Sequence, residues 1–136
     1  MQIGFKHSTK EWDRYITRVR KFPEKLKMLV AKTTQDLSRG TKASVPVKYS
    51  GIRQSVKSVT KDYHGEVNIA AHYAPYVEFG TGRLVNVPQE LSEDAMQFKG
   101  RGIRQVNRSA EPYFYPHFFV QRDKFFKQVQ KALTGL

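Results

Sequence analysis

The chain has 136 residues, 39% of them hydrophobic and 12% aromatic, which suits one domain with a hydrophobic core and excludes a disordered tail. The sequence contains no cysteine, so disulfide bonds and thiolate metal sites are excluded. It has no run of eighteen apolar residues and no long apolar stretch near residue 1, so we expect neither a membrane span nor a signal peptide. We therefore interpret residues 1–136 as a single domain.

Positive charge dominates the composition. The chain carries 24 Lys and Arg against 12 Asp and Glu, a formal net charge of +12 at pH 7. Much of the excess lies in residues 1–50, where twelve basic residues face four acidic ones. Such a balance indicates contact with nucleic acid or with an acidic protein surface. Solvated faces of basic helices are the simpler explanation, and both remain open.

The first third of the chain has the apolar spacing of helices. Ser8 and Glu11 have the spacing of a capping box at a helix start. Pro23 is expected to end this first helix or to begin a second one. The second helix is expected to end at Gly40 or to run on toward Pro46. The two apolar stripes consist of Trp12, Tyr15, Ile16, Val19 and Phe22, and then of Leu26, Leu29, Val30, Thr33 and Leu37.

The middle of the chain predicts a β-hairpin. Residues 51–56 are consistent with one helical turn or with the entry to a strand. Residues 57–63 and 66–73 then alternate as two strands, which we expect to be joined by a turn at His64 and Gly65. A small antiparallel sheet follows from this pattern.

Residues 73–83 form the most distinctive stretch, because they place one carboxylate among aromatic side chains and close with Gly-Thr-Gly. Read with a period of two, Pro75 and Val77 face one way while Tyr76 and Glu78 face the other. This alternation predicts a short half-buried strand or an extended loop that ends in a sharp turn.

Residues 84–111 predict a long loop excursion from the sheet, with a short helix near residues 91–98. Residues 99–108, which follow this helix, are basic, contain two glycines and have no acidic residue. This composition predicts contacts with phosphates or with an acidic partner. The side chains that could make them are Lys99, Arg101, Arg104 and Arg108.

A long helix is expected to end the chain, with Pro116 in its first turn. Its apolar cover is wider than one face of a small sheet requires, because Phe119 and Phe126 form a second stripe seven residues apart. This stripe either docks on a neighbouring subunit or is covered by the first two helices. The sequence does not distinguish these two alternatives.

We find little in the sequence that favours catalysis. The four histidines lack metal-ligand spacing, and neither a nucleophile elbow nor a phosphate-binding loop is present. Glu78 is the one acid in an aromatic context, and His72 lies six residues before it. A catalytic pair is conceivable, but an arginine such as Arg83 holding Glu78 is the ordinary explanation. We predict no enzyme activity, no cofactor and no metal.

The order of these segments resembles the gene-product-ten-like tail-component family of tailed bacteriophages and prophages. The resemblance covers nearly the whole chain and is most specific in the central motif, whose hallmark is Tyr-Ala-x-Tyr-Val-Glu-Phe-Gly-Thr. A proline-flanked aromatic segment before the last helix is the second hallmark. The matching stretches are Gly51-Ile52-Arg53-Gln54-Ser55-Val56, Tyr73-Ala74-Pro75-Tyr76-Val77-Glu78-Phe79-Gly80-Thr81-Gly82 and Pro112-Tyr113-Phe114-Tyr115-Pro116.

The resemblance implies an α+β fold with N-terminal helices and a long C-terminal helix packed on a small antiparallel sheet. It also implies a structural virion protein of the neck or tail, which assembles in the host cytoplasm. Its role would be tail completion or head–tail joining, or alternatively that of a tail terminator capping the tube. A basic nucleic-acid-binding module is the alternative from another class. The implied partners are further copies in a ring and other neck and tail proteins, with non-specific DNA contact open. The motif residues expected to serve assembly are Tyr73, Tyr76, Glu78, Phe79, Gly80, Thr81 and Gly82.

Overall fold

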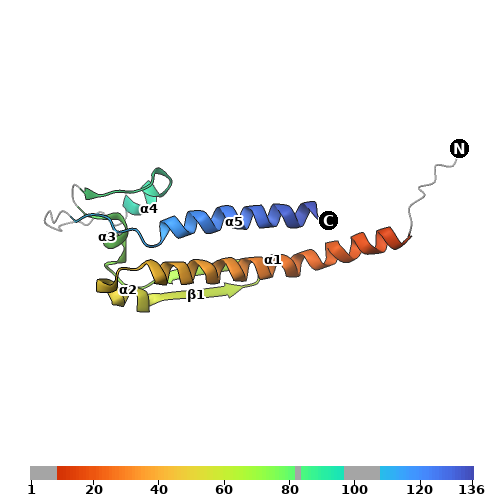
Figure 1. The fold of residues 1–136 in the computed structure, drawn as a ribbon, viewed down its shortest axis with the longest axis horizontal. Coiled ribbons are helices and arrows are strands. Elements are labelled where there is room, and N and C mark those ends of the chain that lie inside the picture. Colours follow the sequence, from red (N-terminus) through yellow and green to blue (C-terminus); the bar gives the residue numbers. More distant parts are fainter. Residues whose placement is uncertain (1–8, 82–83, 97–107) are drawn as a thin grey trace.

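A computed structural model describes residues 9–81, 84–96 and 108–136 and shows an α+β fold, as predicted. The long helix α1 (Thr9–Ser44) lies between a β-hairpin and the second long helix, α5 (Tyr115–Thr134) (Figure 1). The short elements gather at one end of α1. They are η1 (Val47–Tyr49), α2 (Ser50–Ser55), α3 (Ala74–Phe79), η3 (Gln89–Leu91) and α4 (Ser92–Met96).

The predicted pair of N-terminal helices is wrong, because α1 continues through Pro23 as one helix of 36 residues. A proline inside a helix removes a backbone hydrogen bond and costs about 3 kcal/mol. The helix continues because the apolar stripe keeps its phase across the proline, with Val19 and Phe22 before it and Leu26 after it. Ser8 of the predicted capping box lies outside the described residues.

Gly40, predicted as a possible helix end, lies inside α1. A Cβ atom on Gly40 would lie 2.9 Å from Nδ1 of His117, near the start of α5. The same histidine contacts α1 again through the Oγ of Ser44, 2.5 Å from its Nε2. Gly40 therefore permits the close approach of α5 rather than ending α1.

The hairpin is present, but its turn lies earlier than predicted. Strands β1 (Val56–Lys61) and β2 (His64–Ile69) pair antiparallel, with Lys61 opposite His64. The turn is formed by Asp62 and Tyr63, and Asp62 has a φ of 52°. Aspartate tolerates this left-handed conformation, so no glycine is needed there. Gly65 instead sits within β2, where the Oγ1 of Thr34 from α1 occupies the place of a side chain.

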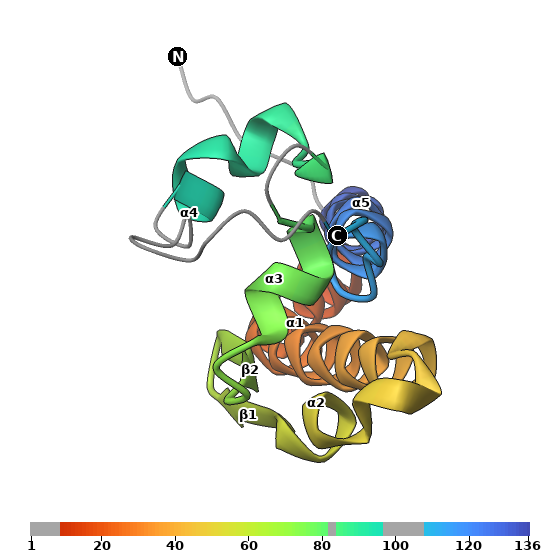
Figure 2. The same ribbon diagram turned by 90° about the vertical axis from the view of Figure 1, so that its left-hand side faces the viewer.

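The hydrophobic core lies at the end of the molecule where α1, α2, α3 and the approach to α5 meet. Figure 2 shows these elements from that end. Residues 51–56, left open between helix and strand, form α2 and then enter β1. Among the described residues no helix combines the length and apolarity needed to cross a membrane. The cluster of buried side chains is Val45, Tyr49, Ile52, Ala74, Val77 and Tyr113.

Candidate functional site

The central motif forms a short helix, so the predicted strand over residues 73–79 is wrong. Helix α3 begins at Ala74, with Tyr73 as its N-cap residue and Pro75 in its first turn. Ala74, Val77 and Glu78 are buried, which is the i, i+3, i+4 spacing of one helix face. Pro75 lacks a backbone N–H and fits the first turn, where that group would have no partner in the helix.

Glu78 binds the backbone at the start of α5. Its Oε2 accepts a hydrogen bond from the backbone N–H of Tyr113 at 2.8 Å, and its Oε1 accepts one from Tyr115 at 2.7 Å. The N–H of Phe114, between them, lies 3.2 Å from Oε1 and 3.1 Å from Oε2. One buried carboxylate thus satisfies three amide donors that precede or open the helix. Arg83, the arginine predicted to hold Glu78, lies outside the described residues.

Burial raises the pKa of the Glu78 carboxyl, and the three backbone donors oppose that shift because they stabilise the ionised form. His117 also favours the ionised form. The carboxyl group is almost completely buried, so a substrate in solution has little access to it. His72, considered as its catalytic partner, is exposed, and the contact of its ring is with Tyr73.

The predicted sharp turn after the motif is confirmed at Gly80, whose φ of 77° and ψ of −178° favour glycine. A Cβ atom there would lie 2.7 Å from the carbonyl oxygens of both Arg108 and Leu84. Directly after it, the backbone of Thr81 pairs antiparallel with that of Arg108. Gly80 and Thr81 therefore bring the two ends of the predicted excursion together. Within the excursion, the expected short helix is present as α4.

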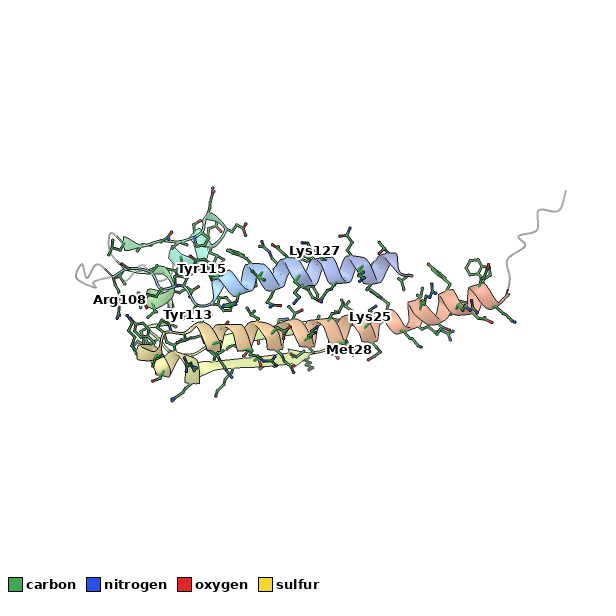
Figure 3. All side chains as sticks on the ribbon, viewed as in Figure 1. Lys25, Met28, Arg108, Tyr113, Tyr115 and Lys127 are labelled. Carbon is green, nitrogen blue, oxygen red and sulfur yellow. The ribbon has the colours of Figure 1, made fainter. Side chains whose placement is uncertain are left out.

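The aromatic residues of the motif pack on two different neighbours. Phe79 stacks on Tyr115 at 6.2 Å between ring centroids, while Tyr73 packs against Tyr49 in the core. Tyr113 is buried, and its hydroxyl donates a hydrogen bond to the carbonyl oxygen of Ala74 at 3.1 Å. α3 is thus joined to the start of α5 by its carboxylate, by its first carbonyl and by its last aromatic ring (Figure 3).

Of the remaining predicted site residues that the structure describes, only Arg108 pairs with the motif, through the backbone of Thr81. The guanidinium of Arg108 lies 5.1 Å from the centre of the Tyr49 ring, next to the core. Phe119 lies between Tyr115 and the guanidinium of Arg122, whereas Phe126 is 61% exposed. Tyr76 is half-buried. Lys99, Arg101, Arg104 and Gly82 lie outside the described residues.

Two residues of this site were not predicted from the sequence. His117 packs on α1 at Gly40 and Ser44, and Tyr113, two residues before α5, reaches α3 through its hydroxyl. A glycine in the middle of an amphipathic helix was the available signal for the first, since such a glycine usually marks close packing. For the second, only the proline-flanked aromatic segment marked its position.

The arrangement is suited to holding elements together. Within the described segments, no group of three or more His, Asp or Glu side chains could hold a metal ion. The buried carboxylate has its oxygens occupied by backbone donors, and the glycine and threonine beside it close a loop. Comparisons with family models, with curated proteins and with solved structures found no match to this chain.

Proposed function

We propose that this chain is a structural virion protein of the phage neck or tail, which acts by assembly in tail completion or head–tail joining. One observation carries the proposal. Residues 73–82, the stretch that resembles the tail-component family, contain one carboxylate. That carboxylate accepts hydrogen bonds from three backbone amides. Such a motif fixes the position of a helix, which is what a subunit that presents surfaces to neighbours requires.

The outer face of α5 supplies a surface for such neighbours. Phe126 is 61% exposed and Leu133 50%, whereas Val120, 62% exposed, lies about a third of a turn away from them. Large apolar side chains exposed along one helix are typical of an interaction surface. Phe126 and Leu133 are seven residues apart and so lie on the same side of the helix.

The proposal is tested in the phage or prophage that carries the gene. Deletion is expected to leave filled heads and tails of normal length that fail to join, as seen by negative-stain electron microscopy. Overlong tails would identify the chain as a tail terminator instead. Joined, infectious particles formed without the gene would refute a role in the neck or tail altogether.

Complementation of the deletion then tests the α5 surface. Phe126→Asp is expected to abolish joining, because it places a charge where an apolar contact is required. Val120→Asp is the matched control, since Val120 is equally exposed and apolar but lies about a third of a turn away from the side of α5 that Phe126 and Leu133 share. Equal loss of joining with both variants, or with neither, would refute the assignment of this surface. Circular dichroism of both purified variants would establish that they remain folded.

A further inference from the structure

The N-terminal part of α1 carries an apolar stripe that lies beyond both α5 and the hairpin. Residues 10–21 are all exposed, and Figure 1 shows α1 continuing past the end of α5 and past the hairpin. Beyond Lys25 and Met28, toward Thr9, α1 runs past the ends of both α5 and the hairpin (Figure 3). We call residues 9–22 the arm. Its large apolar side chains are Trp12, 50% exposed, Tyr15, 47%, Ile16, 42%, and Val19, 42%.

The arm repeats the pattern of the covered part of α1. Its stripe continues with a seven-residue period into the part of α1 that packs on α5, where Leu26 and Leu29 are half-buried and Val30 is buried. α5 runs antiparallel to α1, with His117 against Gly40. Carried along both helices, this register brings Leu136 level with Lys21 and Phe22. α5 therefore stops covering the stripe near Phe22, whereas the stripe continues toward Trp12.

We propose that the arm pairs antiparallel with the arm of a second copy of this chain, about a two-fold axis between Tyr15 and Ile16. This register sets Tyr15 of each copy opposite Ile16 of the other. It also sets Trp12 opposite Val19. A large apolar residue therefore meets another at each level of the stripe, as an isologous interface requires.

The charges beside the stripe complement each other in the same register. Glu11 and Arg18 are seven residues apart and lie on one flank, while Asp13 and Arg20 lie on the other. A two-fold axis places each flank of the stripe opposite the same flank of the other copy. Glu11 therefore meets Arg18 of the other copy, and Asp13 meets Arg20, on opposite sides of the stripe. These are the only two acidic residues of the arm, and each has an arginine within reach.

The exposed apolar face of α5 is a poorer partner for the arm than a second arm is. The solvent-facing half of α5, which includes Phe126, exposes three lysines against one acid, Asp123. The lysines are Lys124, Lys127 and Lys131. The arm has five basic residues and two acidic ones, so its docking on that face would bring like charges together. Pairing of two arms instead places both acids of each arm against arginines.

The pairing also fits the length of the arm. It places Thr9 of one copy level with Phe22 of the other, which is where α5 ends. The second arm therefore continues the cover of the stripe from the end of α5. Two helical segments of this length bury an area at the low end of protein interfaces, below about 1,200 Å². We expect a pair that dissociates in the micromolar range.

This inference does not rest on the phage role, since it concerns the purified chain alone. Cross-linking tests its geometry, because the native sequence has no cysteine and a single introduced thiol is unique. Ile16→Cys lies beside the proposed axis and is expected to give a covalent dimer with a short bis-maleimide. Thr17→Cys is the control, since the next residue points to the opposite face, roughly 15 Å from its counterpart in the pair. Equal cross-linking at both positions, or at neither, overturns the proposal.

Charge reversal tests its register, with sedimentation equilibrium as the measurement. Glu11→Arg with Asp13→Arg, and separately Arg18→Glu with Arg20→Glu, are each expected to weaken the pair at least tenfold. An equimolar mixture of the two double variants should pair again, because every flank then meets the opposite charge. Wild-type chain that stays monomeric at about 100 μM, or variants that do not recover on mixing, would overturn the proposal. A wild-type chain that stays monomeric would indicate an arm that folds back on its own chain. Variants that do not recover on mixing would indicate an arm that binds the acidic helix α4.

Discussion

Glu78→Gln is the sharpest perturbation of the central motif, because it keeps the size of the side chain and removes one acceptor. Both oxygens of Glu78 are used, Oε1 by Tyr115 and Oε2 by Tyr113, and Phe114 is shared. An amide retains one of these oxygens and turns an NH₂ group toward the other backbone donor. Two buried polar groups then face each other without a hydrogen bond.

A buried polar group left without its hydrogen bond costs about 1–3 kcal/mol. We therefore expect Glu78→Gln to lower the free energy of unfolding by about 3 kcal/mol at pH 7, from the loss at two groups. For a chain of this length that corresponds to a melting temperature lower by roughly 10 °C. Urea and thermal unfolding monitored by circular dichroism would measure both values.

Glu111→Gln is the matched control. Glu111 lies near the same segment, but its carboxylate is a partly exposed ion-pair partner of Lys48 at 2.8 Å. The same chemical change there should cost only a small fraction of the loss at Glu78, because water replaces the lost acceptor. A Glu78→Gln variant as stable as Glu111→Gln would refute the reasoning that the backbone donors depend on both oxygens.

The pH dependence of stability distinguishes a protonated carboxyl group at Glu78 from the amide of Glu78→Gln. Burial raises its folded-state pKa above the ordinary value of 4.5, so the folded state binds the proton more tightly than the unfolded chain does. The contribution of this group to stability is therefore complete below pH 4.5 and declines as the pH rises through the folded-state pKa. We expect the stability difference between wild type and Glu78→Gln to be larger at pH 4 than at pH 7. A difference that grows with pH would show that the backbone donors outweigh burial.

Three further predictions concern the neighbours of Glu78 and the hairpin, all measured by chemical or thermal unfolding. Gly80→Ala should cost about 2 kcal/mol or more, because that backbone conformation belongs to glycine and two carbonyl oxygens fill the space of a Cβ; an unchanged stability would contradict it. Tyr113→Phe should cost about 1 kcal/mol through the lost hydrogen bond to the carbonyl oxygen of Ala74, and wild type should lose stability above pH 10 because burial raises the pKa of Tyr113. Gly65→Ala should destabilise the packing of the hairpin on α1, and Thr34→Ala in the same chain should restore part of the loss.

The long elements were predictable from the sequence because their patterns extend over many residues. α5 carries a proline in its first turn and a stripe over twenty residues, and α1 carries its stripe over 36. The same length explains the error at Pro23. One proline outweighed the pattern in the prediction, whereas in the structure the helix keeps its phase through Pro23, with Phe22 and Leu26 half-buried on either side of it.

The short elements were not predictable in the same way. In a six-residue segment such as α3, a buried Val77 is consistent with both a period of two and a period of 3.6. Gly65 attracted the predicted turn because glycine is common in turns, although it serves contact with Thr34. The partners of Glu78 are backbone amides 35 to 37 residues away, and backbone amides leave no signature in a sequence.

The central motif and the arm are connected through the position of α5. Glu78 and Tyr113 fix where α5 begins, and Gly40 allows it to lie close against α1. Since α5 has 20 residues and α1 has 36, this starting point decides how much of α1 remains uncovered. A shift of α5 by one helical turn would cover or expose about four more residues of α1. We therefore expect substitutions at Glu78 to weaken pairing of the arms as well as stability, although the motif lies at the opposite end of the molecule.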